Sequence, residues 1–309
     1  MTSAPTTRAS QGADVRILVN CNAKAMQDPA GRDALVEQVR GVMPDAQVWF
    51  TADDVSIDDL IARATRDGAT MLVAGGGDGT VNAVASAVIG TQRTLGVLPL
   101  GTLNHFAKDL AIPFDIEAAV LLLRDGMVCD VDVGEVNDRV FINNSGLGLY
   151  PDIVRQRERR QEAGSSKWPA AFVSALHALR RYRTLGIRVM VGGKALYRRT
   201  PAVFIGNNEY TTDSGLEPKR PSLSDGCLSL YMPHPHGRAR LLWFSLRALL
   251  GNSGRLEGFD VVLTDSLSIE SRHRRLHVAL DGEVAVMETP LNYRTRARAL
   301  RVLVPTIVR

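Results

Sequence analysis

Long hydrophobic runs are absent from this sequence. No apolar stretch approaches the ~20 residues that a helix needs to cross a bilayer, and the polar N-terminal residues lack the apolar core of a signal peptide. We therefore expect a cytoplasmic protein without a membrane-spanning helix, and a short disordered tail over residues 1–13.

Cysteine is scarce. The three cysteines, Cys21, Cys129 and Cys227, show neither the close spacing of a metal site nor an even-numbered disulfide framework. This pattern fits a reducing compartment such as the cytoplasm.

Aromatic residues are few, and positive charges exceed negative ones only slightly. Aromatics make up 6% of the sequence and the formal net charge is only +4. Because no RNA-binding or zinc-finger motif is present either, we expect no nucleic-acid partner. The mild positive charge permits contact with an anionic membrane surface. The hydrophobic share of 45% and the length of 309 residues indicate a globular protein of about two domains.

Three common enzyme motifs are missing. No Gly-Lys-Ser/Thr follows the glycine cluster at residues 75–79, which excludes a Walker A loop. The same glycines do not have the G-x-G-x-x-G spacing of a dinucleotide-binding dehydrogenase. Ser145 lacks the leading glycine of a serine-hydrolase elbow.

A strand, a glycine turn and a helix start are predicted at residues 71–82, MLVAGGGDGTVN. The apolar run that begins at Met71 is typical of a buried parallel strand. Backbone N–H groups at a helix start bind phosphate oxygens, and glycines let the phosphates come close. Asp78 would repel phosphate directly, so a cation such as Mg²⁺ is expected between them.

The sequence Gly-Thr-x-Asn occurs twice, at residues 79–82 and again at residues 101–104. Each copy follows an apolar run that is predicted to be a strand. Two such corners side by side form the crevice at the carboxyl ends of an open α/β sheet, where ligands bind. A glycine cluster can also be only a tight turn, but two matching corners with an acid in one favour a nucleotide.

Strands and helices alternate through the first half of the chain, which predicts a doubly wound parallel sheet. The expected strands are residues 15–20, 47–50, 71–74 and 95–100, and the expected helices are residues 32–42, 57–67, 81–88, 102–110 and 116–124.

From Met127 the pattern changes to short strands with turn signals, which predicts an antiparallel β-sandwich. The expected strands are residues 130–136, 140–144, 187–191, 195–197, 201–207, 227–232, 259–264, 267–270 and 277–280, with residues 301–305 as a last strand.

The segments GGGDGT and PLGTLNHFA resemble the catalytic domain of diacylglycerol kinases and the related bacterial lipid kinases and sphingosine kinases. The resemblance extends from about Val15 to Val304. It implies a nucleotide-binding α/β domain over residues 14–128, to which residues 296–309 return, and a β-sandwich lipid-substrate domain over residues 129–295, with the active site in the cleft between them.

The resemblance also implies an activity. Such a protein is an ATP- and Mg²⁺-dependent lipid kinase of lipid metabolism and phospholipid biosynthesis. It transfers the γ-phosphate to a hydroxyl of a membrane lipid such as diacylglycerol. We accordingly expect peripheral association with the inner, anionic face of the membrane, and a homodimer is possible.

The resemblance assigns roles to individual residues. Asp281, in the segment Asp-Gly-Glu, is implied to be the general base, and Asp78 to act in catalysis and to hold Mg²⁺. A bare Asp-Gly is otherwise a common hairpin turn. The implied nucleotide contacts are Asn20, Thr51, Gly75, Gly76, Gly77, Gly79, Thr80, Asn82, Gly101, Thr102, Asn104 and Glu283. Asn20 and Thr51 can equally be a turn residue and a helix cap.

A second, structural Mg²⁺ site is expected from the resemblance in the β-sandwich domain. The family often has a pair of acids before a glycine, and here Ser224 and Asp225 precede Gly226. A hydroxyl is a weaker ligand than a carboxylate for Mg²⁺. Asp213 and Glu217 lie nearby and can compensate.

Other features have simpler interpretations. Predicted helices at residues 167–183 and 234–250 combine apolar faces with arginines, which suits either an anionic membrane or packing on the sandwich. The basic cluster at residues 155–160 is more typical of a solvated helix, and the pair His234 and His236 is a weak metal site. His105 at a helix start is interpreted as structural.

Two alternatives to a lipid kinase stay open. One is an NAD kinase, which shares a Gly-Gly-Asp-Gly corner and a two-domain plan. The other is a nucleotide-binding lipid sensor without turnover, which the altered turn after Asn20 and the presence of Ser224 support.

Overall fold

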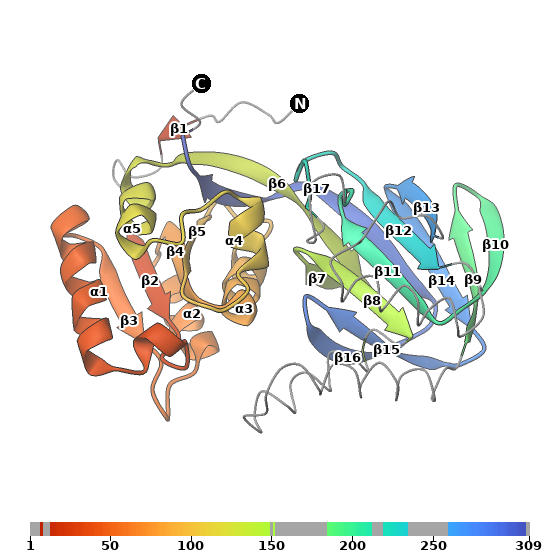
Figure 1. Ribbon diagram of the computed structural model, residues 1–309, viewed down its shortest axis with the longest axis horizontal. Coiled ribbons are helices and arrows are strands. Elements are labelled where there is room, and N and C mark those ends of the chain that lie inside the picture. Colours follow the sequence, from red (N-terminus) through yellow and green to blue (C-terminus); the bar gives the residue numbers. More distant parts are fainter. Residues whose placement is uncertain are drawn as a thin grey trace, which may run out of the picture. The chain divides into compact units, whose positions relative to one another are not determined.

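The computed structural model describes residues 7–8, 13–148, 151, 184–211, 219–233 and 259–306. The chain divides into two compact units (Figure 1). Unit 1 contains Met1–Val133 and Ala297–Arg309, and unit 2 contains Gly134–Arg296. The chain passes from one unit to the other within strands β6 (Met127–Val136) and β17 (Leu291–Val304).

Unit 1 is built on a parallel sheet with the order β5-β4-β2-β3, and the C-terminal part of β17 pairs in parallel with β5. Every residue of β2, β4 and β5 is buried, as expected for strands covered on both faces. The strands are β1 (Thr7–Arg8), β2 (Val15–Val19), β3 (Gln47–Phe50), β4 (Met71–Gly76) and β5 (Thr94–Pro99).

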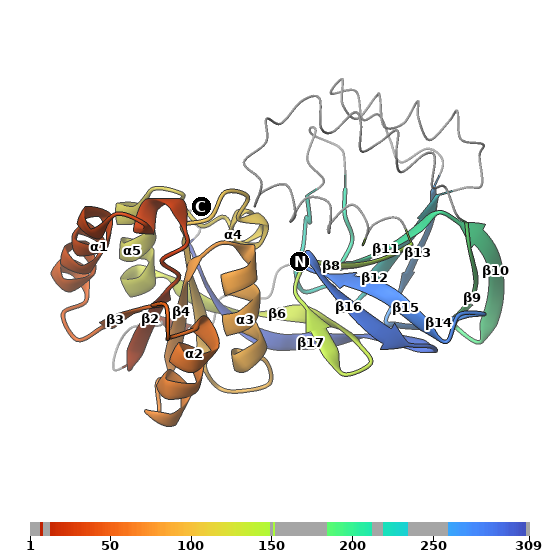
Figure 2. The same cartoon turned by 90° about the horizontal axis from the view of Figure 1, so that it is seen from below.

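Helices cover both faces of this sheet (Figure 2). Helices α1 and α5 pack together on one face, and α2 and α3 pack together on the other. The helices are η1 (Lys24–Met26, 3-10), α1 (Pro29–Val42), α2 (Ile57–Arg66), α3 (Asp78–Val88), α4 (His105–Asp109) and α5 (Ile116–Asp125). The predicted doubly wound α/β fold is confirmed.

Several element boundaries differ from the sequence-based expectations. Helix α1 begins at Pro29 because the Asp28 side chain caps it by accepting from the Ala30 N–H. Helix α3 begins at Asp78, three residues before the expected start. Helix α4 is shorter than expected because Asn104 has a left-handed backbone with φ 50°, which ends helical geometry on its N-terminal side.

Unit 2 is an antiparallel β-sandwich, as predicted. One sheet has the order β13-β12-β11-β8-β15-β16, and the other has the order β10-β9-β14-β17. The strands that lie wholly in this unit are β7 (Arg139–Phe141), β8 (Asn144–Gly148), β9 (Leu185–Val191), β10 (Lys194–Thr200), β11 (Ala202–Asn207), β12 (Leu228–Pro233), β13 (Phe259–Thr264), β14 (Ser266–Ser271), β15 (Arg275–Leu280) and β16 (Glu283–Glu288).

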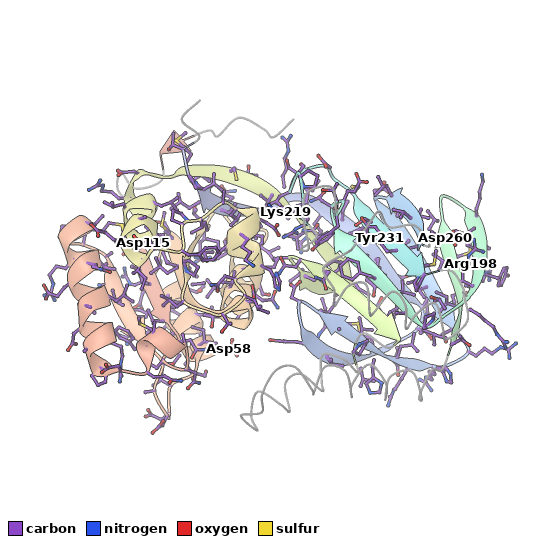
Figure 3. All side chains as sticks on the ribbon, viewed as in Figure 1. Asp58, Asp115, Arg198, Lys219, Tyr231 and Asp260 are labelled. Carbon is purple, nitrogen blue, oxygen red and sulfur yellow. The ribbon has the colours of Figure 1, made fainter. Side chains whose placement is uncertain are left out.

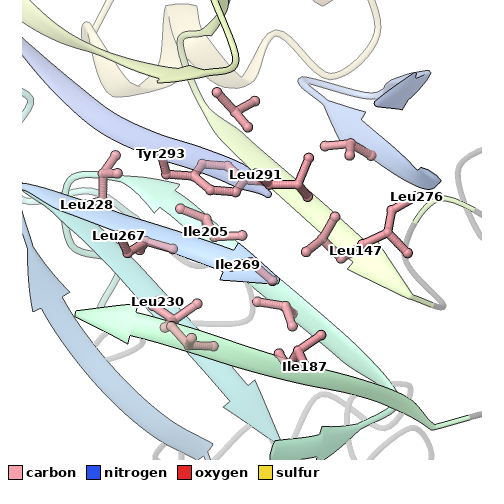
Figure 4. Close-up of a cluster of buried hydrophobic side chains, with 14 of the residues drawn as sticks. Leu147, Ile187, Ile205, Leu228, Leu230, Leu267, Ile269, Leu276, Leu291 and Tyr293 are labelled. Carbon is pink, nitrogen blue, oxygen red and sulfur yellow. The ribbon is translucent and has the colours of Figure 1, made fainter. Parts of the chain in front are cut away.

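Apolar side chains from both sheets fill the interior of the sandwich (Figure 4). Leu147, Ile205 and Leu230 come from one sheet, and Ile269 and Leu291 from the other; all five are fully buried. Side chains from the inner faces of both sheets therefore form one shared core, as in a β-sandwich.

Ion pairing joins the edges of the two sheets. Arg198 on β10 donates to the Asp260 carboxylate on β13 at 3.0 Å (Figure 3). Both side chains are partly exposed, so the pair contributes on the order of 0–1 kcal/mol.

One predicted strand of unit 2 is wrong. Residues 140–144 were expected to form a single strand, but Ile142 and Asn143 lie between β7 and β8. Strand β7 pairs with β6, whereas β8 pairs with β11 and β15 in the other sheet. The short linker therefore carries the chain from one sheet to the other, which a run of strand-forming residues does not reveal. Strand β16 was not predicted.

Some expectations fall outside the described residues. These are the helices at residues 167–183 and 234–250, the basic cluster at 155–160, the pair His234 and His236, and the acids Asp213 and Glu217. Residues 7–8, in the expected tail, form β1 and pair with β6. In the described part of the chain, no helix is long and apolar enough to cross a membrane.

Candidate functional site

The candidate site of unit 1 lies at the carboxyl ends of its parallel strands. Asn20 follows β2, Thr51 follows β3, Gly77 follows β4, and Gly101 follows β5 after one intervening residue. Because these strands are neighbours in one parallel sheet, their carboxyl ends meet at one edge. Within unit 1, the structure thus brings the ends of these four strands, with the residues that the sequence assigned to a nucleotide there, to one edge of the sheet.

The two glycine corners touch through their backbones. A Cβ atom added to Gly101 would lie 2.3 Å from the Gly77 Cα, and one added to Gly76 would lie 2.4 Å from the Thr80 Oγ1. Both distances are far below van der Waals contact, so only glycine fits at residues 76 and 101. Their presence follows from internal packing.

Gly79 is different from these glycines. A Cβ added there would have no protein atom within 4 Å, and its backbone φ is not positive. The residue is exposed in the first turn of α3, and the helix N-cap Gly77 provides no side-chain cap. The protein's own structure therefore does not require glycine at residue 79. An open helix N-terminus with no side chain in front of it is suited to bind phosphate.

Side chains from neighbouring strands fix the turn after β2. The Asn20 Nδ2 donates to the Thr80 Oγ1 at 3.2 Å, and the Asn20 Oδ1 accepts from the Asn22 N–H at 2.9 Å. The Cys21 N–H donates to the Thr51 Oγ1 at 3.0 Å. Asn20 and Thr51 therefore hold this edge of the sheet together.

Asn104 shapes the second corner. Its buried side chain accepts from the Gly101 N–H at 3.1 Å and donates to the Gly101 carbonyl at 2.8 Å. The matching residue of the first corner, Asn82, lies inside helix α3. The two Gly-Thr-x-Asn segments thus share a sequence but differ in conformation. Thr102 is exposed, and Gly75 packs close to Val19.

Asp78 links the two corners. Its Oδ1 accepts from the backbone N–H of His105, the first residue of α4, at 2.8 Å. This bond explains one role of the acid without a metal. The described residues contain no group of three or more side chains suited to hold a metal ion. Mg²⁺ in phosphoryl-transfer sites, however, commonly takes one or two carboxylates together with phosphate oxygens and water. Asp78 fits such a ligand.

The candidate catalytic acid of unit 2, Asp281, lies in the two-residue turn between β15 and β16. Asp281 and Gly282 have φ values of 49° and 95°, as a type I′ hairpin turn requires. The Asp281 carboxylate accepts from three successive backbone N–H groups, those of the linker residues Ile142 at 2.7 Å and Asn143 at 2.8 Å and that of Asn144, the first residue of β8, at 2.9 Å.

Burial raises the pKa of Asp281 to about 6, although the three N–H bonds and the Arg220 cation act in the opposite direction. The residue as a whole is partly exposed, and its carboxylate is directed at residues 142–144. A carboxyl group with a pKa near neutrality can exchange a proton at physiological pH, as a general base must.

Sequence reasoning did not find the residues behind this linker. Arg220 is 5% exposed and donates to the Ile142 carbonyl, and Tyr210 donates to the Asn143 carbonyl. No motif marks either residue. What distinguishes Arg220 from most of the described arginines is its burial, and the sequence does not show which arginines are buried.

The other assigned residues of unit 2 are exposed. Glu283 begins β16, and Asp225 donates its backbone N–H to the Asn208 Oδ1 at 3.2 Å. Asp225 is the one carboxylate that the described residues supply at the expected second metal site. That site therefore stays a prediction.

Comparisons with known proteins agree across both units. A family model described as diacylglycerol kinase catalytic domain matches residues 14–136, and one described as YegS C-terminal NAD kinase beta sandwich-like domain matches residues 155–304.

Three relatives indicate the same kind of protein. A probable lipid kinase YegS-like from Klebsiella pneumoniae is 31% identical over 219 residues, covering 69% of this chain and 72% of the relative. Another from Pseudomonas putida is 27% identical over 297 residues, covering 86% and 98%. A diacylglycerol kinase from Staphylococcus aureus is 26% identical, covering 79% and 77%.

Solved structures share the fold. A putative diacylglycerol kinase from Bacillus anthracis has a TM-score of 0.76 at 20% identity, and each chain is covered completely. Yeast NADH kinase in complex with NADH has a TM-score of 0.51 at 12% identity, covering 96% of this chain and 85% of that one.

Proposed function

The chain belongs to the family of diacylglycerol kinase-like lipid kinases, and from this premise we propose that it transfers the γ-phosphate of ATP to a hydroxyl of a membrane lipid such as diacylglycerol. The observation that carries the proposal is Gly79, because neither packing nor backbone geometry explains a glycine at this open helix N-terminus. A phosphate group in front of the helix would explain it.

Each part of the proposed site has a role in phosphoryl transfer, which depends mainly on positioning and on neutralising charge. The N–H groups of the first turn of α3 bind phosphate oxygens, and Asn104 keeps the second corner in shape beside them. Asp78 would hold Mg²⁺, which when bound offsets the charge of the phosphates. Asp281 accepts the proton of the lipid hydroxyl.

The proposal includes a location. A lipid substrate is reached from a membrane surface, and the excess of basic residues favours an anionic one. We propose that the protein associates peripherally with the cytoplasmic, inner face of the membrane. The proposal is compatible with a homodimer.

The test is transfer of labelled γ-phosphate from ATP and Mg²⁺ into a total lipid extract, resolved by chromatography. Asp281→Asn is compared with Asp265→Asn, which changes an exposed acid in another turn of unit 2. We expect a labelled lipid with the wild type and with Asp265→Asn. We expect none with Asp281→Asn, and none with the wild type after chelation of Mg²⁺.

Other outcomes would replace the proposal. Labelling of NAD, offered as a soluble acceptor in the same assay, without labelling of any lipid would establish an NAD kinase. Tight nucleotide binding without transfer to any acceptor would indicate a lipid sensor.

A further inference from the structure

A buried cation lies behind the Asp281 carboxylate. The Arg220 guanidinium donates to the Ile142 carbonyl at 2.7 Å and to the Asn143 Oδ1 at 2.8 Å. We propose that Arg220 is a positioning residue for phosphoryl transfer, which holds residues 142–144 in the conformation that binds Asp281 and keeps that carboxylate ready to accept a proton. This inference rests on the proposed function, since it concerns the base of that reaction.

A single peptide group connects the two charges. The Ile142 carbonyl and the Asn143 N–H belong to the same peptide unit. Arg220 donates to the oxygen of this unit, while its N–H donates to the Asp281 Oδ1 at 2.8 Å. A charged donor at one end polarises the peptide and strengthens the hydrogen bond at the other. Arg220 therefore acts on Asp281 through this peptide group.

Two further side chains that donate to this linker are neutral. The Asn207 Nδ2 donates to the Ile142 carbonyl at 3.0 Å, and the Tyr210 hydroxyl donates to the Asn143 carbonyl at 3.1 Å. These bonds fix the linker but bring no charge to it. Glu283, two residues beyond Asp281 in the hairpin, is exposed. The positive charge of Arg220 is thus what distinguishes it within the cluster.

The charge of Arg220 lowers the pKa of Asp281 against the effect of burial. Removing it must raise that pKa further, because the ionised carboxylate loses both a nearby cation and the polarised N–H. A general base works only when deprotonated, so activity would then be lost at a higher pH on the acid side of the profile.

The experiment compares Arg220→Met, Arg220→Lys and Tyr210→Phe. For each we measure kcat/KM against pH with diacylglycerol in mixed micelles that contain phosphatidylglycerol. The acid limb of this profile is the range in which kcat/KM falls as the pH decreases. For Arg220→Met we expect this limb to shift to higher pH by about one unit, which means about tenfold lower kcat/KM below pH 6. Arg220→Lys retains the charge and should keep the limb near its wild-type position.

Tyr210→Phe is the matched control for a purely structural role. It removes a neutral hydrogen bond to the same linker, so it should lower the melting temperature without moving the acid limb. An unmoved limb in Arg220→Met, or an equal shift in Tyr210→Phe, would overturn the inference.

A measurement without substrate separates the inference from the proposed function. The difference in unfolding free energy between proteins with and without Asp281→Asn, followed against pH, reports the titration of Asp281. In the Arg220→Met background this titration should move to higher pH, and an unmoved titration overturns the Arg220 inference alone. Absence of any phosphorylated lipid with the wild type overturns the proposed function instead.

Discussion

At the scale of single residues, the glycines of the two corners are there for different reasons: some are needed for internal packing, and Gly79 is left to be explained by a ligand. A Cβ at residue 101 would clash with the backbone of Gly77, whereas a Cβ at residue 79 would have no protein atom within 4 Å. A substitution at residue 79 can therefore affect a ligand without disturbing the fold.

We predict that Gly79→Ala weakens ATP binding at least tenfold, about 1.4 kcal/mol, because a methyl group takes the place of the phosphate. Stability should instead rise by about 0.5–1 kcal/mol, since alanine favours a helix over glycine. Calorimetric titration with a non-hydrolysable ATP analogue and chemical denaturation measure the two effects.

Gly41→Ala is the matched control for this prediction. Gly41 lies in α1, and a Cβ there also meets no atom within 4 Å. The variant should gain similar stability and bind the nucleotide as the wild type does. Unchanged affinity in Gly79→Ala would contradict a phosphate site at this helix.

The second residue-scale prediction concerns Asp281 and stability. Its folded-state pKa of about 6 lies above the ordinary value of 3.8, so between these values the folded protein binds more protons than the unfolded chain. The contribution of Asp281 is therefore most favourable below about pH 4, and is lost as pH rises through about 6, by up to ~3 kcal/mol.

Denaturation curves measured from pH 4 to pH 7.5 test this sign. The free energy of unfolding of the wild type, minus that of Asp281→Asn, should fall as pH rises from about 4 to about 6 and level off above that. A difference that rises with pH would show that the linker lowers the pKa of Asp281 more than burial raises it.

At the scale of elements, the β15–β16 hairpin carries the candidate base in a turn with positive φ angles. Gly282 has φ 95°, which a residue with a Cβ rarely adopts. We predict that Gly282→Ala lowers the free energy of unfolding by about 1–2 kcal/mol. It should also lower kcat, because the turn no longer aims the Asp281 carboxylate at the linker.

Gly193→Ala provides the comparison. Gly193 has φ 75° in the β9–β10 turn and likewise has open space around it. It should show a similar loss of stability in thermal unfolding but no loss of kcat. Equal kcat values in the two variants would mean that the hairpin geometry does not matter to the reaction.

At the scale of the whole molecule, none of the helices in the described residues is long and apolar enough to span a membrane, and the net charge is only +4. We predict binding to anionic vesicles but not to zwitterionic ones in a sedimentation assay. Binding should weaken as salt shortens the Debye length from about 10 Å at 0.1 M to about 3 Å at 1 M. Salt-independent binding would instead indicate apolar insertion.

The sequence by itself determined the fold class, the family and the order of the elements in unit 1. These follow from local patterns: apolar runs of strand length, helical spacing and glycine turns are all encoded by neighbouring residues. It also located Asp78 and Asp281, because short motifs mark both.

Only the tertiary structure decided how these residues interact. Two segments with the same Gly-Thr-x-Asn sequence adopt different conformations, since Asn104 bonds to the loop around it whereas Asn82 lies within a helix. Likewise the Asn143 N–H bonds to the Asp281 carboxylate, and Arg220 bonds to the Ile142 carbonyl, although these residues lie far apart along the chain. Burial and long-range hydrogen bonds create the environment of that carboxylate, and no local pattern records them.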